Sequence, residues 1–379
     1  MFKNTDFSVR QFISLYCNIR YSLSQSKQVF GKEAELYQSL PNGRIKCTAC
    51  ARLCEIPEGK IGLCGIRGVT NNKLQLLVYG RVIAGNLDPI EKKPVTHYRS
   101  GTSIFSIATT GCNWLCKYCQ NYDISQRRKI EGTEMTPNEV VNMAMSYGAH
   151  GIAYTYNEPS IFIEFARDCG IEAHKRGIFN IFVSNGYDTP QSVNMMNQFL
   201  DCITVDFKGS GKLEFVRQYI GIPNADPIFE SLKGIRDRTK IHVEITDLIV
   251  PKVGDDLQAA RKLCKFVYDD LGPDTPIHFL RFHPDYKMME FDDTPIETLE
   301  KHHAVAKEEG LKYAYIGNVP GHRLEHTYCP ECKSIAIERY GFSINSWNLD
   351  QNNCCKKCGY PIPIIGTLIN RRKTRFQFI

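Results

Sequence analysis

The residues with the clearest chemical meaning in this chain of 379 residues are Cys112, Cys116 and Cys119, in the run TTGCNWLCKYCQN. Their C-x3-C-x2-C spacing brings three thiolates into one short loop. A 4Fe-4S cubane usually takes four thiolates, so three would leave one iron open to a substrate or a cofactor, much as a catalytic zinc keeps one exchangeable position. A zinc knuckle is the alternative, and it would need a fourth ligand from elsewhere in the chain.

A second group of cysteines lies upstream, in the run CTACARLCEIPEGKIGLCGIR. Cys47, Cys50, Cys54 and Cys64 are close enough in sequence to bind one metal site, and the glycines allow backbone amides to turn toward the sulfurs. The small loop favours a closed structural zinc site. An auxiliary iron–sulfur cluster is the alternative, because four thiolates also satisfy a cubane.

A third group lies near the end of the chain. Cys329 and Cys332 in CPEC pair with Cys355 and Cys358 in CCKKCG, which is the pattern of a zinc ribbon. Cys354 could replace Cys355 as a ligand. Such ribbons often serve to fold a small segment that lacks a core of its own.

The elements that must position these groups follow an alternating pattern between residues 101 and 320. The predicted buried strands are SIFSIATT, GIAYTYN, NIFVSNG, CITVDF, HVEITDLIV, IHFLRF and YAYIGN. Between them, PSIFIEFARDCGIEAHKRG and DDLQAARKLCKFVYDDLG predict helices. This alternation indicates an α/β fold with a parallel sheet, and six or seven such units suit a full or partial barrel. In such a barrel, functional residues lie at the carboxyl ends of the strands.

Composition and charge indicate where the protein acts and which partners it lacks. The net charge of +6 is mild, and no apolar run approaches the roughly 18 residues of a membrane span. The first residues lack a signal-peptide core, so we expect a cytoplasmic protein whose cysteines bind metals. The basic tail from Arg371 to Arg375 indicates a solvated terminus, and the ribbon lacks the basic and aromatic pattern of a nucleic-acid site.

The cysteine loop, with Tyr118 before its last cysteine and Gln120 and Asn121 after it, resembles the signature of radical S-adenosylmethionine (SAM) enzymes. That resemblance implies a partial, TIM-like (β/α)6 barrel and a 4Fe-4S cluster whose open iron binds the amine and carboxylate of SAM. It also implies reductive cleavage of SAM to a 5′-deoxyadenosyl radical, which abstracts hydrogen from a substrate.

The same resemblance gives roles to polar residues that follow the later strands. Glu158 in TYNEP would accept a hydrogen bond from the SAM ammonium group, and the Asp-x-Lys pair in VDFKG would orient the ribose and carboxylate. The candidate cofactor-binding residues are Tyr118, Gln120, Asn157, Glu158, Ser184, Asn185, Asp206, Lys208 and His283.

Plainer interpretations stay open for three of these positions. Glu158 and its neighbours could cap the helix that follows. Asp206 and Lys208 could form an ordinary surface ion pair. His283 could be a structural histidine, although it lies at the end of a predicted strand.

Longer segments resemble one branch of the family. VYGRVIAGNLDPIEKKPVTHY, GCNWLCKYCQNYDISQ, YTYNEP, RFHPDYKM and YIGNVPGH look like the radical SAM component of the AmmeMemoRadiSam system, which is itself similar to pyruvate formate-lyase activating enzymes. This implies AMMECR-type and Memo-type partner proteins, a reductant such as ferredoxin or flavodoxin, and an unidentified protein or metabolite substrate. A glycyl-radical activase and a zinc-stabilised, non-catalytic binding module are the alternatives.

Together these patterns predict four segments. Residues 1–46 would form an N-terminal helical segment, and residues 47–100 a cysteine-rich metal-binding module. Residues 101–322 would form the radical SAM core, and residues 323–379 the zinc ribbon with its basic tail.

Overall fold

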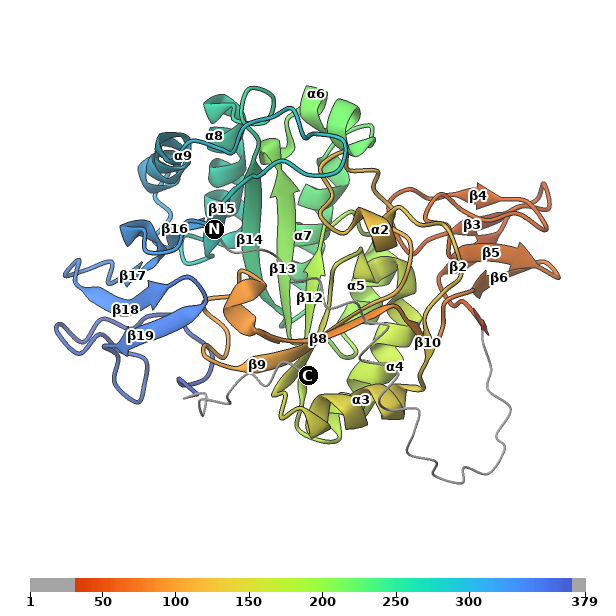
Figure 1. The fold of residues 1–379 in the computed structure, drawn as a ribbon, viewed down its shortest axis with the longest axis horizontal. Coiled ribbons are helices and arrows are strands. Elements are labelled where there is room, and N and C mark those ends of the chain that lie inside the picture. Colours follow the sequence, from red (N-terminus) through yellow and green to blue (C-terminus); the bar gives the residue numbers. More distant parts are fainter. Residues whose placement is uncertain (1–30, 370–379) are drawn as a thin grey trace.

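The computed structural model describes residues 31–369, and its centre is an eight-stranded sheet in the order β16-β15-β14-β13-β12-β11-β9-β8 (Figure 1). All neighbours from β9 to β16 are parallel, and β8 pairs antiparallel with β9 at the edge. The parallel strands are β9 (Ser103–Ala108), β11 (Gly151–Tyr154), β12 (Phe179–Ser184), β13 (Cys202–Lys208), β14 (His242–Ile249), β15 (Ile277–Arg281) and β16 (Ala314–Gly317). These are the seven strands that the alternating pattern predicts.

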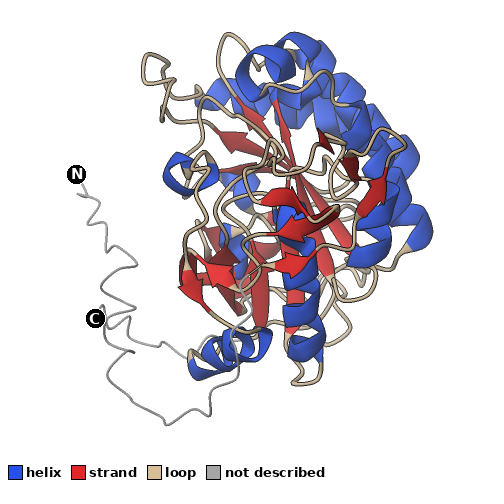
Figure 2. Ribbon diagram, turned by 90° about the vertical axis from the view of Figure 1, so that its right-hand side faces the viewer, coloured by secondary structure: helices blue, strands red, loops and turns tan. Residues whose placement is uncertain are grey.

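Helices connect the strands and gather along one side of the sheet (Figure 2). The longer ones are α3 (Pro137–Ser146), α4 (Ile163–His174), α5 (Pro190–Met196), α7 (Asp226–Arg238), α8 (Leu257–Phe266) and α9 (Ile296–Glu308); α2 (Tyr122–Ser125) and α6 (Leu213–Phe215) are single turns. The two predicted helices correspond to α4 and α8. Sequence signals fix where helices begin: a proline opens both α3 and α5, and Thr136 and Thr189 close capping boxes before them.

The described part of the predicted N-terminal helical segment is not helical. Residues 31–46 contain β1 (Lys32–Glu33), β2 (Tyr37–Ser39) and the start of β3 (Ile45–Cys47). A turn at Gly43, whose φ is +75°, reverses the chain between β2 and β3, and this conformation suits glycine. The helical prediction is therefore wrong for this part, and residues 1–30 lie outside the described residues.

The rest of the N-terminal module is built from short antiparallel strands. β3 pairs with β2 and with β4 (Glu55–Ile56), and β6 (Lys73–Leu76) pairs with β1 and with β5 (Arg67–Thr70). β7 (Arg81–Val82) pairs with β10 (Thr133–Glu134), which belongs to the core segment. The module shares one hydrophobic core with the barrel, so it is packed onto the barrel rather than tethered beside it.

The boundary predicted at residue 100 needs correction, because β8 (Ala84–Pro89) belongs to the central sheet. Its sequence AGNLDP has low β-propensity and ends in proline, which is tolerated at a sheet edge. The local pattern therefore hid a strand that only its pairing with β9 reveals.

The C-terminal ribbon consists of β17 (Thr327–Tyr328), β18 (Ile335–Tyr340) and β19 (Ser343–Trp347). Its small core joins Ala336 and Ile337 to Tyr313 and Tyr315 of the barrel. Figure 1 shows the ribbon and the N-terminal strands on opposite sides of the central sheet. Within the described residues, no helix has the length and apolar character needed to cross a membrane.

Candidate cluster and cofactor site

The cysteine loop leaves the carboxyl end of β9 through Gly111. Its φ is +86°, and a Cβ at this position would lie 2.3 Å from the carbonyl oxygen of Cys64. Only glycine allows this approach, which places the N-terminal cysteine module directly against the cluster loop. Arg52 adds a second contact by donating from Nε to the Asn113 carbonyl at 2.9 Å.

The three cysteines of the loop are partly buried. Burial raises the pKa of the Cys112 thiol to about 12 and that of Cys116 well above its usual value, while the charge of Lys208 acts in the opposite direction on Cys116. Burial also raises the pKa of Cys119. Thiols in such surroundings become thiolates when a metal supplies positive charge, so the donor set fits a bound iron–sulfur cluster.

Asn157, after β11, ties the second strand end to the cysteine loop. Its Nδ2 donates to the Gly111 carbonyl at 2.8 Å and to Thr109 Oγ1 at 3.2 Å. Its Oδ1 is buried and has no hydrogen-bond partner among the described residues. A buried acceptor without a partner is costly, so this atom is available to a donor that the protein itself does not supply.

Glu158 shows the capping geometry that was the alternative to cofactor binding. It precedes the 3-10 turn Pro159–Phe162, and its Oε1 accepts from the backbone N–H of Ser160 at 3.0 Å. Ser184 Oγ donates to the same oxygen at 2.9 Å, and the Asn185 N–H donates to Oε2 at 2.7 Å. Burial raises the pKa of Glu158 despite these bonds. The carboxylate therefore joins the ends of β11 and β12.

Asp206 and Lys208, at the end of β13, form an ion pair of 2.9 Å between Oδ2 and Nζ. The pair is not an ordinary surface contact, because the two side chains are only 23% and 16% exposed. Thr246 of β14 donates to the other carboxylate oxygen of Asp206. Lys208 is the last residue of β13, so the pair lies at the carboxyl end of this strand.

Gln120 and His283 are 163 residues apart in the sequence, and they are in contact in the structure. The Nε2 atoms of the two side chains are in contact, and His283 is exposed. The loop after β15 reaches the cysteine loop again where the Lys287 N–H donates to the Lys117 carbonyl at 2.8 Å. Tyr118, unlike His283, is buried, and its ring stacks on Phe215 with ring centroids 5.9 Å apart. This contact packs the cysteine loop against α6.

Three residues near the site had no role in the sequence interpretation. Asn113 is buried, and its Oδ1 accepts from Asn185 Nδ2 at 2.7 Å. Asp188 is buried beside Glu158, and burial followed by the charge of Glu158 raises its pKa well above the usual value. Asp88 of β8 accepts from Lys93 at 2.8 Å and from the Tyr156 hydroxyl at 2.9 Å. Only their three-dimensional neighbours distinguish them, although Asp88 lies in a segment that carries the family resemblance.

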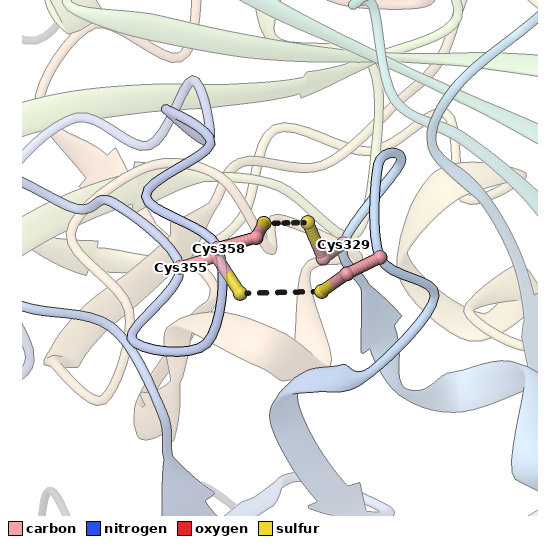
Figure 3. A group of neighbouring side chains, drawn as sticks. Cys329, Cys355 and Cys358 are labelled. Atoms are coloured by element: carbon pink, nitrogen blue, oxygen red, sulfur yellow. Dashed lines mark hydrogen bonds between the residues drawn. The ribbon is translucent and has the colours of Figure 1, made fainter.

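The ribbon cysteines form a second, separate site. Cys329 Sγ lies 3.5 Å from Cys358 Sγ, and Cys332 Sγ lies 3.7 Å from Cys355 Sγ (Figure 3). All four sulfurs are within 4.8 Å of one another, so this group could hold a metal ion. Hydrogen bonds from Ser334 lower the pKa of Cys332 to about 6, which favours the metal-binding thiolate at neutral pH. Cys355 rather than Cys354 belongs to the group.

The N-terminal cysteines form a third group. Every cysteine of the described residues is free of disulfide bonds. Cys47, Cys50, Cys54 and Cys64 line one common cavity. The fold and these groups define an α/β protein with a cysteine-lined cluster site at the carboxyl ends of its parallel strands.

Comparisons with known proteins identify the family. Residues 106–267 match the radical SAM superfamily. An uncharacterized protein of Methanocaldococcus jannaschii is 42% identical over 337 residues, which cover 88% of this chain and 99% of that protein. The chain belongs to the radical SAM superfamily, and this membership implies an enzyme with a 4Fe-4S cluster, SAM and a source of electrons.

Solved structures with similar folds are much more distant. A domain of pyruvate-formate lyase-activating enzyme from Bacteroides vulgatus is 17% identical, with a TM-score of 0.39, and the match covers 45% of this chain and all 100% of that domain. A radical SAM methyltransferase from Sphaerobacter thermophilus is 13% identical, with a TM-score of 0.45 and 57% and 66% of the two chains covered. Similarity at this level carries no information about the substrate.

Proposed function

We propose that this protein is a radical SAM enzyme that cleaves SAM reductively and acts on a protein or metabolite substrate. Cys112, Cys116 and Cys119 would hold the 4Fe-4S cluster. The observation that carries the proposal is the convergence of three further strand ends on the cysteine loop that follows β9. Asn157 after β11, Asn185 after β12 and Lys287 after β15 each form a hydrogen bond with this loop. The reduced cluster, when bound, supplies the electron that splits SAM and gives the 5′-deoxyadenosyl radical.

The chain's own residues would bind and orient the cofactor. The unpartnered Oδ1 of Asn157 is a buried acceptor beside the cysteine loop, which suits the SAM ammonium group. Glu158 would act on the cofactor indirectly, because its two oxygens already accept hydrogen bonds from the Ser184 hydroxyl and the Asn185 N–H. We therefore assign to Glu158 the positioning of the Ser184 side chain and the Asn185 backbone, so that these two residues would contact the ribose.

The opposite side of the site would carry charge and shield the reaction. Lys208 ends β13, and its ion pair with Asp206 keeps its ammonium group in place, which suits the carboxylate of SAM. Gln120 and His283 meet at the exposed edge, where they could contact the adenosyl group or the substrate. Burial of the thiols would exclude water from a reactive radical.

Sequence segments support a narrower assignment. Because VYGRVIAGNLDPIEKKPVTHY and YIGNVPGH resemble the AmmeMemoRadiSam branch, we infer a role for AMMECR-type and Memo-type proteins as partners and for ferredoxin or flavodoxin as reductant. We also infer zinc in the ribbon, because the separations of its sulfurs suit four ligands of one tetrahedral ion.

The proposal is tested by incubating the anaerobically purified, reduced protein with SAM and measuring 5′-deoxyadenosine and methionine by mass spectrometry. Cys116→Ala should abolish both products. Cys264→Ala is the matched control, because Cys264 is a buried cysteine of α8 outside the site. Absence of products from cluster-replete wild-type protein would refute the proposal.

A further inference from the structure

We infer that Cys47, Cys50, Cys54 and Cys64 hold an auxiliary 4Fe-4S cluster beside the cysteine loop of the barrel. This reverses the preference for zinc that the small size of their loop supports. The inference rests on the positions of the sulfur atoms, and it does not depend on SAM cleavage.

The first step is the separation that a single zinc ion requires. Zinc–sulfur bonds of about 2.3 Å in a tetrahedron place the four sulfurs about 3.8 Å apart. The ribbon meets this condition, with separations of 3.5 and 3.7 Å for its two facing pairs. The four sulfurs of the ribbon therefore have the spacing of ligands to one ion.

The N-terminal cysteines do not meet the same condition. Across residues 31–369, the ribbon is the one set of three or more cysteine, histidine or acidic side chains whose ligand atoms lie within 4.8 Å of one another. No three of the N-terminal thiols therefore approach closely enough to share a single ion. All four nevertheless line one common cavity.

The cysteine loop of the barrel provides an internal reference for a cluster site. The sulfurs of Cys112, Cys116 and Cys119 likewise do not all lie within 4.8 Å of one another. Each cysteine of a cubane binds a different iron, so the sulfurs stand farther apart than around one ion. The N-terminal group thus has the open spacing of the barrel loop and not the tight spacing of the ribbon.

The burial of the cysteines provides further support. Cys47, Cys50 and Cys64 are buried, and Cys54 is partly buried. Solvent exposure is among the features that set the reduction potential of iron–sulfur clusters. The apolar side chains of Ile56 and Ile161 complete the cavity wall.

The position of the cavity gives the cluster a neighbour. Asn113, which follows Cys112, lines the cavity, and the Cys64 carbonyl packs against Gly111. Residues next to Cys112 on both sides therefore contact the N-terminal cysteine site. Two paramagnetic clusters at such a place should interact magnetically when both are reduced.

The test uses the full-length Cys112/Cys116/Cys119→Ala triple variant, purified anaerobically and reconstituted with iron and sulfide. We expect it to retain about four irons and four sulfides per chain, as one cubane requires. Its reduced electron paramagnetic resonance spectrum should not change on addition of SAM, because a four-cysteine cluster has no open iron. Retention of zinc in place of iron would overturn the inference.

Wild-type protein keeps the inference testable if the triple variant does not fold. Two cubanes would give about eight irons per chain, and the ribbon about one zinc. About four irons and two zincs would overturn the inference. The proposed SAM cleavage is measured separately, so a protein with eight irons that does not cleave SAM would refute the proposed function and leave the auxiliary cluster intact.

Discussion

The buried ion pair between Arg67 and Glu164 should decide whether the N-terminal module stays on the barrel. Both side chains are 1% exposed. Arg67 donates to both oxygens of Glu164 and, at 2.7 Å, to the Ile161 carbonyl. Glu164 also accepts from the Glu35 N–H at 3.1 Å. One pair thus connects β5, α4 and the segment before β2.

Removing one partner should be costly. Glu164→Gln leaves the guanidinium buried without a counter-ion, and breaking such a pair typically costs about 3–5 kcal/mol of folding stability. The double variant Arg67→Met/Glu164→Leu removes both charges, so it should recover most of this loss. Lys73→Ala is the control, because its pair with Glu33 is 55% and 44% exposed and should contribute about 0–1 kcal/mol.

The pair also predicts the sign of a pH dependence. In the wild type, the Arg67 charge holds the pKa of Glu164 below its usual value against the effect of burial, so the pair stabilises the fold above the unfolded pKa and this contribution is lost as pH falls. In Arg67→Met, burial alone should raise the pKa of Glu164. That variant should therefore become more stable as pH falls from 7 toward the unfolded value.

Anaerobic urea denaturation at several pH values measures both effects. Limited proteolysis of the native variants reports separately on release of the N-terminal strands. A loss below about 1 kcal/mol for Glu164→Gln, or equal losses for Glu164→Gln and Lys73→Ala, would refute the reasoning, because it would place the pair in the range of exposed ion pairs.

Three further predictions concern the metal and cofactor sites. Glu158→Gln should lower the free energy of unfolding by about 1–3 kcal/mol. In either orientation of the glutamine amide, its NH2 group would face the backbone N–H of Ser160 or of Asn185, and two donors cannot form a hydrogen bond. Unchanged urea denaturation would contradict this prediction. Asn157→Ala should weaken SAM binding by about one to two decades while keeping the cluster absorption, and equal affinity in equilibrium dialysis would remove its proposed role. Cys332→Ala should lower the zinc content by about one per chain and leave iron unchanged, whereas full retention of zinc on elemental analysis would show that the ribbon binds none.

The sequence was sufficient to locate the seven parallel strands, because each strand is a short buried run bounded by turn residues. Parallel pairing then places the carboxyl ends of these strands at one edge of the sheet. For this reason Gln120 and His283, which are 163 residues apart in the sequence, are in contact. The resemblance of the cysteine loop to radical SAM enzymes likewise agrees with the family match.

Contacts between distant segments could not be predicted in this way. β8 has no local strand signal, and its identity depends on pairing with β9. Arg67 and Glu164 are 97 residues apart, and the sequence around each residue does not indicate that the two form an ion pair. Asn113 and Asp188 are polar residues of ordinary appearance whose burial only the packed structure reveals.

The most direct test of the central claim is electron–nuclear double resonance. The reduced protein is measured with bound SAM that carries ¹⁵N in its amino group. If Cys112, Cys116 and Cys119 hold a cluster with an open iron, SAM should change the electron paramagnetic resonance spectrum and a ¹⁵N coupling should appear. The spectrum of Cys116→Ala should show neither change. An unaltered spectrum without ¹⁵N coupling, in wild-type protein shown by dialysis to have bound SAM, would contradict the account.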